Sequence, residues 1–287
     1  MPSLAVFKKH AVPIVLLATV SAFQLMDSVV TGTYIVSFMR FAGIPLATAG
    51  TIIFVSRIGD VLGVLLSGPM ADLCKRRIVA YFAIALTTLL VHDLAKSLGV
   101  EKAEVVGHDI GLMVAYAYAA QFPTEVTKLV LMDAFLPGVS GWEAVYNNPG
   151  IWHFRFNGPT PEALVQGRER TYFDYFWNDF AADKTHSIPE ADRKAYTAAY
   201  ARPGRMHAGW AYFVSFQQAA KDFAQLSETK LTMPVLTIGG EKSLGEALGQ
   251  QTKLVATDVT VVVLKDTGHW VLEERPKETT EALQKFL

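Results

Sequence analysis

The stretch AEVVGHDIGLMV, residues 103–114, decides the fold because it joins a strand pattern to a helix pattern through a tight turn. Its first five residues form a short apolar run typical of a buried parallel strand. The apolar run LMVAYAYAAQFP, residues 112–123, is typical of a helix that its proline ends. Between the two lies Gly107-His108-Asp109-Ile110-Gly111, a small-x-acid-x-small pattern typical of a sharp, strained strand-to-helix turn. We expect side chains at the two glycine positions to collide with the neighbouring strand and helix.

Strands and helices alternate through the rest of the C-terminal two-thirds. Further apolar runs are KLVLMD (128–133), PVLTIGG (234–240) and VTVVVLK (259–265). Alternation of this kind predicts a parallel sheet with helical crossovers. The long segment at about 139–223, between the second and third strands, is rich in aromatic residues and helical patterning, as a cap over a pocket would be. The sequence therefore predicts an α/β fold of about four parallel strands plus a helical cap.

The pattern also predicts a reaction centre. Asp109, at the turn, is the expected nucleophile, and the helix N-terminus behind it stabilises its negative charge. His269 follows the last strand, in KDTGHWVLEERP, and is the expected base. The acid that holds the histidine tautomer has two candidates, Asp133 after the second strand and Glu241 after the third, and we favour Asp133. These residues fit covalent hydrolysis, in which a carboxylate forms an ester and water activated by the histidine cleaves it. The Ile110 N–H is the expected oxyanion donor.

Together these residues resemble the α/β-hydrolase superfamily, in the branch of epoxide hydrolases and haloalkanoate dehalogenases that uses an Asp nucleophile. The resemblance covers about residues 91–287. In the cap, IWHFRF (151–156) and GRER (167–170) resemble a subfamily of bacterial epoxide hydrolases that hold the epoxide oxygen with a His and a Tyr. The resemblance implies His153 and Tyr212 for this pair, as hydrogen-bond donors to the developing alkoxide. The alternative is that both side chains only pack in an aromatic cap core.

The resemblance also limits the substrate. Relatives that act on fluoroacetate place arginines one and four positions after the nucleophile, where this chain has Ile110 and Met113. Neither pairs with an anion, so a small neutral electrophile, an epoxide, is favoured. A haloalkane remains an alternative, because tryptophan donors suitable for a halide are present. The residues expected to line the substrate pocket are aromatic: Trp152, Phe154, Trp210 and Trp270. No cofactor is expected, and the single cysteine, Cys74, excludes an intrachain disulfide and any Cys-based metal site.

The N-terminal third has a different composition. Asp, Glu, Lys and Arg number 10 in residues 1–90 and 43 in residues 91–287. The apolar runs at 11–39 and 43–70 are each long enough to cross a bilayer. Basic residues before the first run and after the second predict a hairpin with both ends in the cytoplasm. GPMADLCKRR, residues 68–77, resembles a loop motif of major facilitator superfamily transporters.

The predicted organisation is therefore a transmembrane, transporter-like segment over 1–90, in contact with the lipid bilayer, followed by a truncated hydrolase domain over 91–287. The run at 78–91 is short for a crossing. Its length favours a continuation into the amphipathic helix at His92, so we expect the hydrolase part to be cytoplasmic, whereas a crossing would place it outside the cytoplasm. The net charge of −1 gives no case for nucleic-acid binding, and the oligomeric state is not predicted.

Part of the resembled fold has no counterpart in the chain. In the family about 90 residues precede the elbow helix and supply four strands and an H-G-x-P oxyanion loop, and this chain contains no His-Gly pair. We therefore expect the strand at 103–107 to be an exposed edge and the activity to be impaired. The two functional hypotheses are a membrane-tethered epoxide-hydrolase-like enzyme and an inactive remnant of a transporter–hydrolase fusion.

Overall fold

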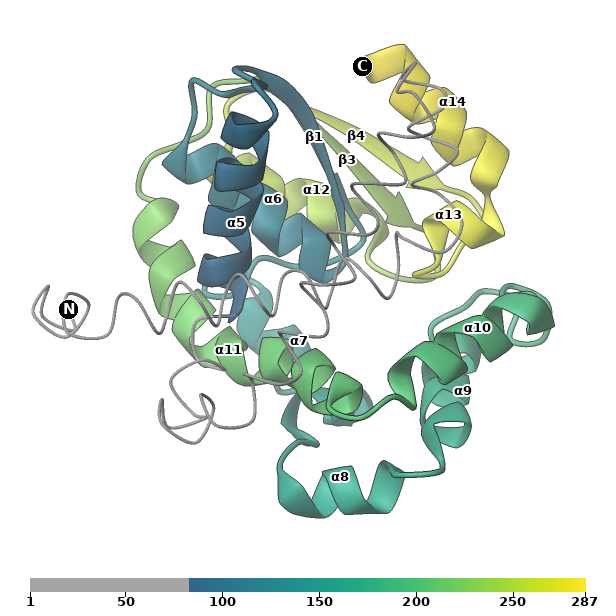
Figure 1. The fold of residues 1–287 in the computed structure, drawn as a ribbon. Helices are drawn as coiled ribbons and strands as arrows, with labels where there is room; N and C mark the ends of the chain where they lie inside the picture. Colours follow the sequence, from purple (N-terminus) through teal and green to yellow (C-terminus); the bar gives the residue numbers. More distant parts are fainter. Residues whose placement is uncertain (1–82) are drawn as a thin grey trace, which may run out of the picture. The chain divides into compact units, whose positions relative to one another are not determined.

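Four parallel strands form the sheet in the computed structural model, which describes residues 83–287 (Figure 1). In spatial order they are β1 (Ala103–His108), β2 (Val126–Met132), β3 (Val235–Gly240) and β4 (Val259–Leu264). The four strands expected from the sequence are confirmed, as is the class of fold, a parallel sheet with helices between its strands. β3 is buried along its whole length and β2 along most of it, whereas most residues of β1 and β4 are partly or fully exposed. β2 and β3 are more buried because they are the central strands, whereas β1 and β4 lie at the edges of the described sheet.

Helices cover both faces of the sheet. On one face, α6 (Ile110–Gln121) and α12 (Gly245–Val255) bury apolar side chains against the strands. On the other, α13 (Val271–Glu274) and α14 (Pro276–Phe286) cover a smaller apolar cluster. The α6 sequence is apolar on all sides, and its residues from Leu112 to Ala119 are all buried, because α5 and α11 pack on α6 from the side away from the strands.

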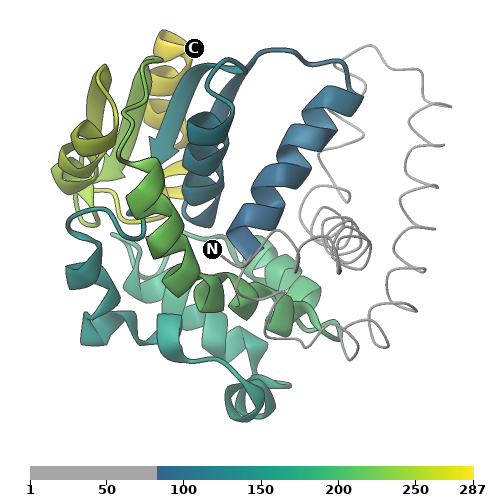
Figure 2. The same ribbon diagram turned by 90° about the vertical axis from the view of Figure 1, so that its left-hand side faces the viewer.

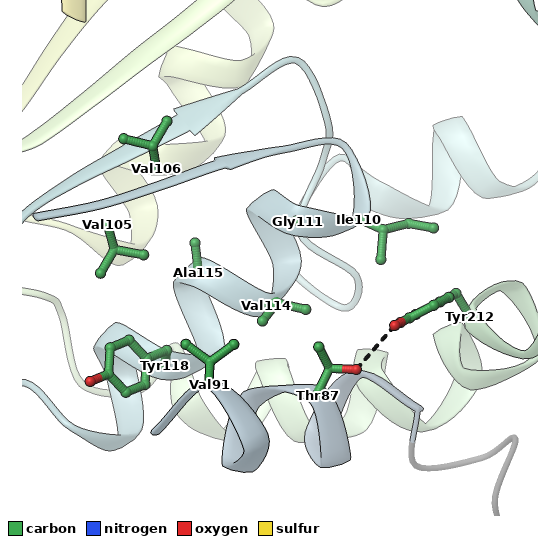
Figure 3. Close-up of a pocket in the computed structure, with 10 residues that line it drawn as sticks. All are labelled: Thr87, Val91, Val105, Val106, Ile110, Gly111, Val114, Ala115, Tyr118 and Tyr212. Atoms are coloured by element: carbon green, nitrogen blue, oxygen red, sulfur yellow. Dashed lines mark hydrogen bonds between the residues drawn. The ribbon is translucent and has the colours of Figure 1, made fainter. Parts of the chain in front are cut away.

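The β1 edge is open among residues 83–287. There β1 pairs only with β2, and the Val106 side chain is 42% exposed. A cavity of about 290 Å³ lies beside this edge, lined mostly by valines and by the first residues of α6 (Figure 3). The exposed edge strand expected from the sequence is therefore present in the described part of the chain.

Helix α5 (Ala83–Ser97) runs without a break through His92. The end of the apolar run at 78–91 and the amphipathic segment after it thus belong to one helix, which closes at Gly99 with a φ of 71°. Glu125 holds this helix to the domain through His92 at 3.0 Å and Lys96 at 2.8 Å. Among the described helices, none combines the length and the apolar character needed to span a bilayer.

The predicted transmembrane runs at 11–39 and 43–70, and the transporter-like motif at 68–77, lie outside the described residues. The membrane location therefore stays a prediction. The domain boundary near residue 90 falls within α5 (Ala83–Ser97) and also stays a prediction.

The cap between β2 and β3 is helical, as expected. Its helices gather at one end of the sheet (Figure 1, Figure 2). They are α7 (Trp142–Tyr146), the 3₁₀ helix η1 (Pro149–Arg155), α8 (Pro159–Val165), α9 (Glu169–Asp179), α10 (Glu190–Tyr200) and α11 (Arg205–Leu226). Aromatic side chains from η1, α9 and α11 pack together and form the interior of the cap.

Candidate active site

The strand-to-helix turn has the strained geometry that the sequence predicts. Asp109 stands between β1 and α6 with φ 54° and ψ −124°, a conformation that non-glycine residues rarely adopt. A Cβ on Gly107 would lie 2.2 Å from the Gly111 carbonyl oxygen, so only glycine fits there. The expectation for Gly111 is wrong: a Cβ there would meet nothing within 4 Å. Gly111 lines the cavity at the open β1 edge, where the described residues place no strand against it.

Three of the predicted residues come together at this turn. The His269 Nδ1 donates a hydrogen bond to the Asp133 Oδ2 at 2.9 Å. The other ring nitrogen, Nε2, lies 3.8 Å from the Asp109 Oδ2, which is longer than a hydrogen bond. The Asp109 side chain is half exposed, whereas His269 is 16% exposed and Asp133 is fully buried. The His269 imidazole thus lies between two carboxylates, that of the buried Asp133 and that of the half-exposed Asp109.

Asp133 is held in place at the end of β2. Its Oδ1 accepts a hydrogen bond from the Gly240 N–H at 3.0 Å, and its Oδ2 accepts one from the Ser243 hydroxyl at 2.6 Å. The Ser243 hydroxyl, which follows β3 in the chain, thus supports the carboxylate of Asp133. Glu241 lies apart from His269, because its carboxylate accepts a hydrogen bond from the Asp266 N–H at 3.0 Å.

The charges of these groups shift one another's pKa values. Burial alone lowers the pKa of His269, but the hydrogen bond to Asp133 and the negative charges of Asp109 and Asp133 outweigh burial and raise this pKa to about 10. Burial alone raises the pKa of Asp109, but its interaction with His269 and the nearby histidines lowers this pKa overall. In the free protein, therefore, Asp109 is an anion next to an imidazolium.

His108 is a neighbour that the sequence analysis did not single out. Its Nε2 donates a hydrogen bond to the His269 carbonyl at 2.9 Å, and the two rings are 4.7 Å apart. Burial and the charge of His269 lower the pKa of His108. A neutral His108 therefore fixes the backbone of His269 without adding a second positive charge.

His153 faces the turn from the cap. It is 5% exposed in η1 and is surrounded by aromatic rings, the nearest being Phe154 and Phe176 at 4.7 Å. Burial lowers the pKa of His153 to about 4, although the charge of Asp109 opposes this shift. Among the described residues, the His153 Nδ1 has no hydrogen-bond partner. A buried polar atom without a partner, close to a carboxylate, is suited to a ligand oxygen.

Tyr212 is not placed beside His153. Its hydroxyl forms a hydrogen bond with the Thr87 hydroxyl at 3.1 Å, at the cavity along the β1 edge (Figure 3). The next residue on α11, Phe213, contacts His153 instead, with the rings 5.3 Å apart. The implied His–Tyr pair is therefore not formed, because the helix register turns Phe213 rather than Tyr212 toward His153.

Tyr200 is a second residue that the sequence analysis missed. It ends α10, packs on Phe173 with the rings 4.7 Å apart, and lies close enough to Asp109 to be affected by its charge. Burial and the charges of Tyr212 and Asp109 raise the pKa of Tyr200. No local motif marks this tyrosine, because only the folding of the cap brings the end of α10 toward the turn.

The aromatic residues expected to line the pocket have different roles. Trp152 and Phe154 flank His153 in η1. Trp210 is 3% exposed and donates its Nε1–H to the Tyr172 hydroxyl at 2.9 Å. The Trp270 Nε1–H is donated to the Phe176 carbonyl at 3.1 Å. Trp210, one of the two tryptophans suited to bind a halide, therefore has no free N–H. Trp152 stays the other candidate donor for the haloalkane alternative.

The first N–H of α6 belongs to Ile110. The first four N–H groups of a helix have no partner within it, so this group is available at the turn. Its position immediately after Asp109 is suited to an oxyanion formed on the Asp109 carboxyl carbon.

Comparison with known proteins agrees with this geometry. Residues 85–276 match the family model of the alpha/beta hydrolase fold. The soluble epoxide hydrolase of Corynebacterium sp. (strain C12) is 28% identical over 205 residues, which are 68% of this chain and 70% of that enzyme. Epoxide hydrolase 1 of Caenorhabditis elegans is 24% identical over 210 residues, 69% of this chain and 50% of that protein.

A solved structure is similar over a comparable share of the chain. The crystal structure of Cfl2 from Burkholderia cenocepacia has a TM-score of 0.67 and 29% identity, and the match covers 72% of each chain. The similarity to epoxide hydrolases is thus of low identity and extends over the described part of the chain. Because the family model covers well over half of the sequence, the chain belongs to the α/β-hydrolase fold family.

Proposed function

We propose that the protein hydrolyses a small neutral epoxide through an ester on Asp109. The observation that carries the proposal is the Asp109–His269–Asp133 arrangement, with a strained carboxylate 3.8 Å from an imidazole that a buried carboxylate orients. The similarity to epoxide hydrolases supports the choice of substrate.

In the first step, an Asp109 oxygen attacks an epoxide carbon and the ring C–O bond breaks. The oxygen that is released accepts a hydrogen bond from His153, whose buried Nδ1 has no other partner among the described residues. Stabilisation of this developing charge lowers the barrier to ring opening, and the alkoxide takes a proton from solvent. His153 is neutral near pH 7, because burial lowers its pKa to about 4, and a neutral imidazole still donates an N–H.

The second step explains how a histidine with a raised pKa serves as a base. Ester formation removes the negative charge of Asp109, which is one of the two charges that raise the pKa of His269. The pKa of His269 therefore falls in the intermediate, and the imidazole releases its proton. It then takes a proton from a water molecule that attacks the Asp109 carboxyl carbon, while the Ile110 N–H stabilises the oxyanion. Collapse of this intermediate breaks the bond between the Asp109 carboxyl carbon and the diol oxygen. The leaving oxygen takes the proton of the new carboxyl group, which releases the diol and restores the Asp109 carboxylate beside the protonated His269.

A single-turnover experiment in ¹⁸O-labelled water tests the proposal. With the full-length chain in excess over an epoxide such as epibromohydrin, the first diol is expected to be unlabelled, while the label enters the Asp109 carboxylate. Excess epoxide then gives labelled diol. His269→Gln is expected to accumulate the ester, and Asp109→Ala to form neither ester nor diol. Label in the first diol would indicate direct attack by water, and absence of turnover by the wild-type chain would favour the inactive-remnant hypothesis.

A further inference from the structure

We propose that Glu274 is a positioning residue that ties the cap to the loop carrying His269. The Glu274 carboxylate bridges the two parts of the domain. One oxygen, Oε2, accepts a hydrogen bond from the Ala182 N–H of the cap at 2.8 Å. The other, Oε1, accepts hydrogen bonds from the N–H groups of Gly268 at 3.1 Å and Trp270 at 3.3 Å, on either side of His269. A single carboxylate thus holds both neighbours of His269 and the cap loop between α9 and α10.

The cap contacts this loop directly as well. The His269 N–H donates a hydrogen bond to the Phe180 carbonyl at 2.7 Å. A Cβ on Gly268 would lie 2.4 Å from the Phe180 carbonyl oxygen and 2.6 Å from the Ala182 nitrogen, so glycine is required for the two backbones to approach so closely. The end of α9 and the histidine loop are therefore in direct backbone contact, and Glu274 adds a carboxylate that accepts hydrogen bonds from both.

The same cap segment supports His153. The rings of Phe176 and Phe180 pack on the His153 ring at 4.7 and 5.5 Å. The contacts therefore run from His153, through the end of α9 and Glu274, to His269. This path links the group that receives the epoxide oxygen to the group that activates water, so the placement of the cap sets the position of both.

Loss of Glu274 has a specific expected consequence. Hydrogen bonds to a carboxylate are stronger than neutral ones, and Glu274→Ala leaves three N–H groups without this acceptor. The His269 loop is then free to drift from the water-activating position, while Asp109 keeps its place at the start of α6. The hydrolysis of the ester should therefore slow more than its formation.

The kinetic part of the test rests on the proposed function and uses the full chain with an epoxide. We expect Glu274→Ala to lower kcat and KM together by about tenfold, with kcat/KM nearly unchanged and the Asp109 ester accumulating in intact-mass spectra. Glu274→Gln keeps one acceptor oxygen and should lie between the alanine variant and the wild type. The matched control is Glu278→Ala, an exposed glutamate on α14, which should change neither constant. A fall in kcat/KM with KM unchanged, or no difference from the control, would overturn the proposal.

Hydrogen–deuterium exchange tests the same connection without any turnover. Peptides covering 180–182 and 268–270 should both exchange faster in Glu274→Ala, with the rest of the domain unchanged. Faster exchange at only one of the two segments, or across the whole domain, contradicts a specific connection. If the wild-type chain forms no diol, the proposed function fails, while this measurement still decides the role of Glu274.

Discussion

The two sides of the reaction centre are built differently. On the side of His269, backbone and side-chain groups fix the loop through the Asp133 carboxylate, the Phe180 carbonyl and Glu274. On the side of the β1 edge, the turn borders an apolar cavity, and the polar contact there joins the Thr87 and Tyr212 hydroxyls. Within residues 83–287, the proton-transfer groups are thus fully supported by the fold, while the region beyond Ile110 is open. Substitutions on the His269 side should therefore lower the activity far more than substitutions on the side of the β1 edge.

The largest effect is expected for the buried acid. Asp133→Asn removes the carboxylate that orients His269 and stabilises its imidazolium, so kcat should fall by roughly 10⁴-fold. Glu241→Gln, which changes an exposed carboxylate bound to the Asp266 N–H, should leave kcat close to the wild-type value. Diol formation measures both, and circular dichroism checks that the variants are folded. A larger loss in Glu241→Gln would assign the acid to the other candidate.

The next effect concerns the cap. His153→Phe removes the proposed hydrogen bond to the epoxide oxygen within an aromatic environment that accepts a ring, and kcat/KM should fall by roughly 10²-fold. Tyr212→Phe is the matched control, because its hydroxyl contacts Thr87 rather than His153. We expect this variant to keep most of its activity. An equal loss in both variants would mean that Tyr212 turns toward the substrate in the complex.

The sequence predicted the parts of this centre that depend on local pattern. The four strands, the turn at Asp109 and the helical cap all leave a periodic or glycine signal in the chain, and these were correctly located. The apposition of Asp133 and His269 also follows from strand order, because parallel strands bring their carboxyl ends to one edge of the sheet.

What the sequence did not predict depends on helix register and tertiary packing. Phe213 rather than its neighbour Tyr212 lies beside His153, because of the rotation of α11 about its axis. The sequence does not fix this rotation, because α11 has apolar residues on several sides. Tyr200 lies in no recognisable motif. Glu274 lies within KDTGHWVLEERP, but its contact with the Ala182 N–H of the cap depends on tertiary packing. Gly111 was interpreted as sterically required because a neighbouring strand was assumed, and the described residues place none there.

A smaller effect concerns the pH dependence of stability. The pKa of His269 is raised in the folded protein to about 10 from an ordinary value of 6.5, so its protonated form stabilises the fold. This contribution is complete below about pH 6.5 and is lost as the pH rises toward 10. The difference in Tm between the wild type and His269→Gln should therefore shrink by a few degrees over this range. A difference in Tm that stays constant over this range would contradict the raised pKa of His269.

The smallest effect is expected on the open side, at Gly111. The new methyl group of Gly111→Ala meets nothing within 4 Å, and alanine is favoured over glycine in a helix, so the free energy of unfolding should stay the same or rise by up to about 0.5 kcal/mol. Gly107→Ala is the contrasting variant: its Cβ would lie 2.2 Å from the Gly111 carbonyl oxygen. Such a clash should cost about 3 kcal/mol or more. Urea unfolding of both variants measures the difference. Equal losses at the two positions would mean that the space beside Gly111 is filled in solution, and the contrast between the two sides of the centre would then disappear.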